Sequence, residues 1–231
     1  MIEYKVGAYV PSDSMSDLIC DNYPMLLVMS RFGIELGFGE DSIGEACSKN
    51  GVDVTTFLAV VNTLIAGNKA RKAIDYKAIS LSSLVEYLHN SHSYFLEYRL
   101  PLIRQELVEA LSPSGDVAVV VLSYYDQYVD EVRDHMMREE NELFPYINAI
   151  IAESSQVKYS IDDYSKNHDK VESKLSELKN IMLKYFSAKT TNELNNVLYD
   201  IFSCERDLAS HNSIEDFLLV PAIKAREEQN S

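Results

Sequence analysis

Apolar residues recur every three or four positions along most of this chain, with polar residues between them. That spacing places the apolar side chains on one face of an α-helix. Phe57, Val61 and Leu64, for example, share one face of a helix predicted over 54–66. Only 8 Gly and 6 Pro interrupt the pattern in 231 residues. The sequence therefore predicts an all-α protein.

Residues 1–67 are predicted to form a small helical N-terminal domain. Two of its helix starts carry side chains that can satisfy free backbone N–H groups: the capping box Ser42-Ile-Gly-Glu45 and the N-cap Asp53. The polar stretch 68–80 follows and is interpreted as a linker. The three helices are predicted over 14–32 with an interruption at Pro24, over 42–49, and over 54–66.

The remaining segment, 81–231, holds four long helical patterns joined by short links. Such a series is typical of an up-down-up-down four-helix bundle. The first helix is expected to begin at Ser83-Leu-Val-Glu86, which has the form of a capping box. Pro145 is expected to kink or break the second helix, because proline lacks the backbone N–H of a helical residue. The four patterns cover about 83–111, 116–153, 161–186 and 190–226.

The net charge excludes two classes of partner. Lys and Arg number 21 and Asp and Glu 36, so the formal charge is 21 − 36 = −15. Phosphate backbones are bound by clustered Lys and Arg, so we expect no nucleic-acid partner. An anionic membrane surface would repel this chain. We also expect no membrane span and no secretory signal, because no apolar run reaches ~18 residues and the N-terminus lacks a basic region followed by an apolar core.

The cysteines favour a cytoplasmic location. The chain has only Cys20, Cys47 and Cys204, which are scattered and form no CxxC pair. They make no disulfide framework, so a reducing compartment fits best. We interpret them as small apolar packing residues.

The histidines follow the predicted bundle. Each of its four helices carries at least one of the five histidines, and the N-terminal domain carries none. Three of them are followed four residues later by Glu, where chance would give about 0.4 such pairs. Residues i and i+4 share one face of a helix. The pairs are His135/Glu139, His168/Glu172 and His211/Glu215.

This constellation indicates a metal site in the bundle core. Unpaired charge in a core costs several kcal/mol, and a metal removes that cost because imidazole and carboxylate become ligands. Mixed nitrogen and oxygen ligands suit iron, manganese or zinc. A single His/Glu pair is more often a surface contact, and His89 competes with His92 on the first helix. A structural zinc site would usually be rich in Cys. The candidate ligands are His92, His135, Glu139, His168, His211 and Glu215.

Two of these motifs resemble the hemerythrin-like (HHE) domain. The run from His135 to Pro145, HMMREENELFP, is similar to the HxxxE…LFP signature of the family. The run from His211 to Pro221, HNSIEDFLLVP, resembles the HxxxE…P motif of its fourth helix.

The other two helices resemble the same family. His168-Asp is similar to the third-helix motif, and Ser-His92-Ser-Tyr followed by Leu100-Pro101 resembles the first-helix motif with one extra residue before Leu-Pro. Oxygen-carrying hemerythrins have a second third-helix His where this chain has Glu172. The chain therefore looks unlike a plain O2 carrier.

The N-terminal segment resembles the small domain that precedes the hemerythrin-like domain in the RIC family, the iron–sulfur cluster repair di-iron proteins. The likeness lies in Arg31-Phe-Gly-Ile-Glu35, Ser42-Ile-Gly-Glu-Ala-Cys47 and Gly51-Val-Asp53. The chain departs from the family at 35–40, which reads ELGFGE where the family usually has an adjacent Cys-Cys-Gly-Gly. Thiol chemistry of that pair is therefore not expected here.

The resemblance implies a non-haem centre of two Fe ions with an oxo or hydroxo bridge. It assigns all six candidate ligands to that centre, with Glu139 and Glu215 bridging. The implied function is repair of iron–sulfur clusters damaged by nitrosative or oxidative stress, through iron release or through NO or O2 chemistry. The implied partners are O2, NO and damaged iron–sulfur proteins, and a homodimer is left open. The alternatives are an O2- or NO-binding sensor and an iron-binding or storage bundle without repair activity.

Overall fold

The computed structural model describes residues 8–67, 71–111, 116–153, 159–167, 172–185 and 192–230. Every regular element within these ranges is a helix, apart from an isolated bridge between Ser14 and Ser42. The all-α prediction is confirmed. None of the helices described is long and apolar enough to cross a bilayer. The contacts divide the chain into a first unit, Met1–Ser91, Phe144–Lys166 and Ser213–Ser231, and a second unit, His92–Leu143 and Asn167–Asn212.

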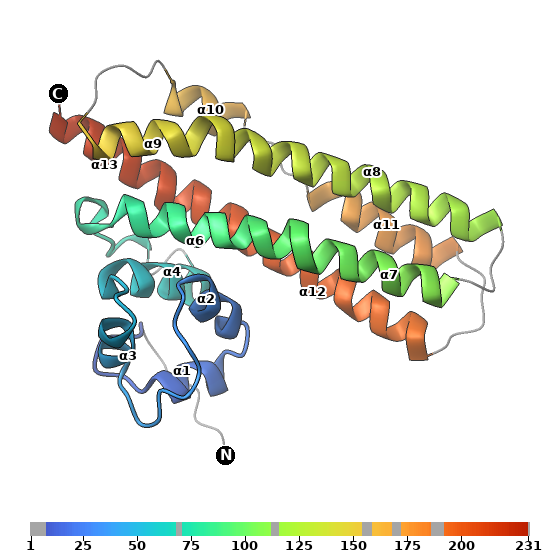
Figure 1. Cartoon of the computed structure of the whole chain (residues 1–231), viewed down its shortest axis with the longest axis horizontal. Coiled ribbons are helices and arrows are strands. Elements are labelled where there is room, and N and C mark those ends of the chain that lie inside the picture. Colours follow the sequence, from blue (N-terminus) through green and yellow to red (C-terminus); the bar gives the residue numbers. More distant parts are fainter. Residues whose placement is uncertain are drawn as a thin grey trace. The chain divides into compact units, whose positions relative to one another are not determined.

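The second unit is a bundle of four long helices that run in alternating directions (Figure 1). Helix α8 packs against both α7 and α11, and Arg99 reaches α12 through a 2.7 Å ion pair with Asp200. The up-down-up-down order therefore agrees with the prediction. The helices are α7 (Leu100–Leu111), α8 (Asp116–Arg138), α11 (Glu172–Tyr185) and α12 (Asn192–Ile214).

An apolar layer fills the interior of this bundle. Its members recur at helical spacing on all four helices, as the sequence pattern requires. Tyr125 is fully buried, and its hydroxyl donates a 2.9 Å hydrogen bond to the carbonyl of Leu100, so burial leaves that polar atom satisfied. The layer includes Leu100, Ile103, Leu107, Leu111, Val121, Tyr125, Tyr128, Val132, Leu175, Leu178, Met182, Val197, Ile201, Cys204 and Leu208.

The N-terminal part of the first unit holds four short helices. The stretch expected as one helix interrupted at Pro24 is two helices, with Pro24 at the N-cap of the second. Proline fits that position because a helix start needs no N–H from it. The four are α1 (Met15–Asp21), α2 (Met25–Arg31), α3 (Ile43–Lys49) and α4 (Val54–Ala66).

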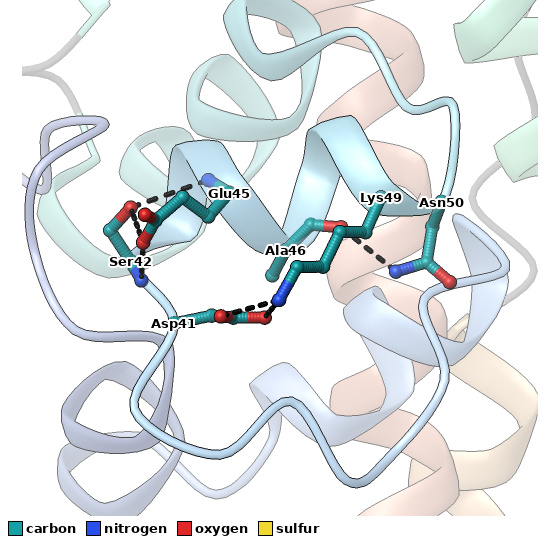
Figure 2. A network of polar contacts seen from close by, with 6 residues as sticks. All are labelled: Asp41, Ser42, Glu45, Ala46, Lys49 and Asn50. Carbon is teal, nitrogen blue, oxygen red and sulfur yellow. Dashed lines mark hydrogen bonds and ion pairs between the residues drawn. The ribbon is translucent and has the colours of Figure 1, made fainter.

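Side-chain caps fix the ends of α3 and α4, as predicted. Figure 2 shows the capping box, in which Ser42 accepts from the Glu45 N–H while the Glu45 carboxylate accepts from the Ser42 N–H at 2.8 Å. The Asn50 amide closes the other end of α3 on the Ala46 carbonyl at 2.8 Å. The predicted N-cap Asp53 accepts from the backbone N–H of Thr56 in the first turn of α4.

The rest of the first unit comes from the flanking parts of the chain. Contacts join α4 to the segment η5 (Glu215–Leu219). They also join α13 to α9 and to the turn Tyr76–Ala78, which lies in the stretch interpreted as a linker. One start differs from the prediction: α6 begins at Leu81, and Ser80, not Ser83, supplies the capping oxygen, to the Ser83 N–H. The helices are α6 (Leu81–Ser93), α9 (Phe144–Ile151), α10 (Ile161–Asn167) and α13 (Val220–Asn230).

Within the described residues, three helical runs contain a π-helical segment, in which the backbone is wound more widely than in an α-helix. Of the two outcomes expected at Pro145, a break is wrong, because the chain stays helical from α8 through η4 into α9, and a kink stays a prediction. A π segment before the proline relieves the clash that an α-helix would suffer there. The segments are η2 (Tyr94–Arg99), η4 (Glu139–Leu143) and η5 (Glu215–Leu219).

Candidate metal centre

The three described candidate histidines each lie in the last turn of an α-helix that continues into a π segment. His92 lies in the last turn of α6, just before η2. His135 lies in the last turn of α8, and His211 in the last turn of α12. Glu139 and Glu215 are the first residues of the π segments that follow, so each His/Glu pair spans one turn of a continuous helix.

The structure gathers these side chains into one buried group, the polar cluster. His92, Glu139, His211 and Glu215 each offer an atom within 4.8 Å of the others. His135 adjoins them, since its Nε2 lies 3.3 Å from Oε1 of Glu139. All five are buried, and His211 and Glu215 are fully so at 0% exposure. The sixth candidate, His168, lies outside the described residues.

Glu139 joins two imidazoles. Its Oε2 lies 3.2 Å from Nε2 of His92, while its other oxygen faces His135. A carboxylate whose two oxygens face different nitrogen ligands has the form needed to bridge two ions. The ring centroid of His92 also lies 5.0 Å from that of His211. Phe95 meets His211 edge-on at 6.0 Å and gives the cluster an apolar wall.

Glu140 is a member of the site that sequence reasoning missed. Its Oε1 lies 2.8 Å from Nδ1 of His92. An ionised carboxylate only accepts, so Nδ1 donates and Nε2 keeps the lone pair that a metal needs. The only sequence signal was the adjacent pair Glu139-Glu140. Glu140 is no i+4 partner of a histidine, since residue 136 is Met, and neighbouring α-helical residues point about 100° apart.

The competing candidates separate by burial. His89 is exposed, whereas His92 is 2% exposed and sits in the cluster. Glu142, seven residues after His135, is also exposed. The side chain of Glu172 lies outside the part that the structure describes.

The donor set fits a metal with mixed nitrogen and oxygen ligands. Buried carboxylates and imidazoles are costly together unless something compensates their charge and polarity. A divalent or trivalent ion does so, and imidazole with carboxylate suits iron or manganese. The described residues therefore fit the di-iron centre that the family resemblance implies.

The cysteines do not form part of this cluster in the described structure. Cys204 packs in the apolar layer and Cys47 is buried in the first unit, as expected of packing residues. Burial, reinforced by the charge of Asp53, raises the pKa of the Cys47 thiol to about 12. Cys20 is exposed, so the packing interpretation is wrong for that residue.

Fold and site together define a helical-bundle metal-binding protein, and the comparisons with known proteins name its family. Residues 83–223 match the family model of the hemerythrin HHE cation binding domain, which is more than half of the chain. The chain therefore belongs to the hemerythrin HHE family, as its motifs predicted.

The chain is also similar to a named repair protein over nearly its whole length. It is 20% identical over 215 residues to the iron–sulfur cluster repair protein ScdA of two strains of Staphylococcus epidermidis. That likeness covers 90% of this chain and 96% of each relative. The likeness therefore extends beyond residues 83–223, which the family model matches.

Proposed function

We propose that this protein binds two iron ions in its polar cluster and acts in the repair of iron–sulfur clusters damaged by nitrosative or oxidative stress. The observation that carries the proposal is the buried meeting of two His/Glu pairs with His92. Membership of the cation-binding family supports the metal. The likeness to ScdA supports the repair role.

The proposed ligands are the six candidates of the sequence, His92, His135, Glu139, His168, His211 and Glu215. Bound iron would supply open coordination positions for O2 or NO and a change of oxidation state. The chain's own residues set the surroundings. Glu139 presents one oxygen to each of two imidazoles, Glu140 holds the proton of His92 on Nδ1, and Phe95 limits access of water to His211.

We assign the chemistry to the bundle rather than to a thiol pair. The segment where the family carries Cys-Cys reads Glu35-Leu-Gly-Phe-Gly-Glu40, with Leu36 exposed at 74% and both glycines at positive φ. The buried Cys47 has a raised pKa and is a poor nucleophile at neutral pH. We place the protein in the cytoplasm on the basis of this cysteine usage.

One experiment tests the repair role directly. An enzyme whose [4Fe–4S] cluster has been damaged by NO is incubated with iron-loaded protein, and its activity is followed. We expect recovery beyond that given by the same amount of free ferrous iron. Recovery equal to free iron would reject repair by iron release.

A second experiment tests chemistry with NO. The diferrous protein is mixed with NO without air, and its absorption and electron paramagnetic resonance spectra are recorded. We expect an iron–nitrosyl signal that His135→Ala loses. No signal in the unsubstituted protein would reject NO chemistry, and a signal without cluster recovery would favour the sensor over the repair protein.

A further inference from the structure

The three π segments share one relation to proline. Each ends two residues before a proline, since η2 ends at Arg99, η4 at Leu143 and η5 at Leu219. The segment η2 has 6 residues, whereas η4 and η5 have 5 each. The prolines are Pro101, Pro145 and Pro221.

The proline explains the π segment. In an α-helix the carbonyl four residues before a proline would clash with its ring and lack an N–H to accept. In a π turn each carbonyl pairs with the N–H five residues ahead, so the carbonyl four residues before the proline is aimed past its ring, and the carbonyl five residues before it is the one left without an N–H. Such bonds are present, since the Leu100 N–H donates to the Phe95 carbonyl and the Val220 N–H to the Glu215 carbonyl. The helix thus passes the proline without breaking.

Two of these π segments begin on a candidate ligand, and the third does not. Glu139 opens η4 and Glu215 opens η5, whereas η2 begins after His92 and contains no candidate ligand. In η4 the adjacent Glu139 and Glu140 reach the two different nitrogens of His92, at 3.2 and 2.8 Å. Regular α-helical winding turns neighbours about 100° apart, so the wider turn changes which carboxylates face the cluster.

We infer that Pro145 and Pro221 are positioning residues of the metal centre. They act through the backbone: each holds open a π turn, and that turn aims Glu139 and Glu140, or Glu215, at the cluster. Pro145 is exposed, so its ring fills no cavity and its effect on the site comes from the backbone alone. The inference rests on the proposed metal site and adds to it the part that shapes its carboxylates.

The test uses Pro145→Ala and Pro221→Ala in the full chain, with Pro101→Ala as matched control. Pro101 is exposed and follows a π segment too, but that segment carries no candidate ligand. Ferrous iron and Co(II) are titrated against a competing chelator. We expect both test variants to bind each metal at least about tenfold more weakly, as for residues that orient metal ligands, and the control to bind within about threefold of the unsubstituted protein.

Two further measurements separate positioning from general damage. Alanine favours α-helix over proline, so the melting temperature of the metal-free Pro145→Ala protein should be unchanged or higher. Backbone hydrogen exchange over 139–146 should slow as the turn tightens. The visible spectrum of bound Co(II), which reports ligand geometry, should change in both test variants and stay the same in Pro101→Ala.

The outcomes are distinguishable. Unchanged affinity and Co(II) spectra in both test variants would overturn the positioning role while leaving the metal site intact. An equal loss in Pro101→Ala would overturn it as well, because the effect would not follow the carboxylates. If the unsubstituted protein bound neither iron nor Co(II), the proposed function itself would fail.

Discussion

The apolar layer and the polar cluster are both buried and helical, yet they contribute to folding with opposite signs. A large apolar side chain such as Leu178, fully buried, stabilises the fold by about 1.5–3 kcal/mol. The polar cluster buries groups such as His211 and Glu139, whose removal from water costs several kcal/mol without a metal. The apolar layer therefore stabilises the bundle, and the bundle in turn keeps the costly polar cluster buried.

The largest expected effect comes from breaking the apolar layer. Leu178→Ala removes a fully buried side chain from α11 and leaves a cavity. We expect the free energy of unfolding to fall by about 2–5 kcal/mol, measured by urea denaturation of the metal-free protein. Leu183→Ala, on the same helix but 58% exposed, is the control and should change it by less than about 0.5 kcal/mol. Equal effects would contradict the assignment of the core.

The second prediction concerns the polar cluster, where apolar substitutions should not lower the free energy of unfolding of the metal-free protein. His135→Leu combined with Glu139→Met replaces a buried polar pair by apolar groups of similar size. We expect the metal-free protein to unfold with unchanged free energy, or with up to about 4 kcal/mol more. Iron binding should be lost in the same variant. A large loss of metal-free stability would show that the cluster itself supports the fold.

The third prediction concerns Glu140. Glu140→Gln keeps the side chain's shape but weakens its hold on the Nδ1 proton of His92. We expect iron affinity to fall about 10–100-fold, by competition with a chelator. Glu142→Gln changes an exposed Glu in the same π segment and should have no effect. The same affinity in both variants would remove Glu140 from the site.

The sequence predicted best what depends on near neighbours. Ser42 and Glu45 cap α3 because both partners lie within four residues, and the helix predicted over 54–66 has these bounds in the structure, with the expected N-cap Asp53. The i+4 pairs of His and Glu also depend only on helix geometry. Their convergence with His92 was expected from the bundle, and the described structure brings five of the six candidates together.

The sites that sequence reasoning missed or misjudged each depend on information that neighbouring residues in the sequence do not carry. Glu140 joins the site through a contact with His92, 48 residues away. Pro145 was interpreted by the rule for α-helices, which does not include a π turn that keeps the helix continuous. Ser80 replaced Ser83 as a cap because the helix begins earlier, where the Ser80 N–H also donates to Thr56 on α4.

The smallest expected effect comes from the Ser42 cap, which should stabilise the first unit locally without acting on the polar cluster. Ser42→Ala removes one side of the capping box in the first unit. We expect unfolding free energy to fall by about 1 kcal/mol and iron affinity to stay the same. Ser48→Ala, exposed near the end of the same helix, is the control. A change in iron affinity would show that the cap acts on the site.

The most direct test of the central claim is the metal content of the purified protein, by elemental mass spectrometry, together with its absorption spectrum. The account predicts about two irons per chain, with oxo-bridged ferric bands in the near ultraviolet, and the loss of both in His135→Ala. Protein without metal, or with a single zinc that survives His211→Ala, would contradict it.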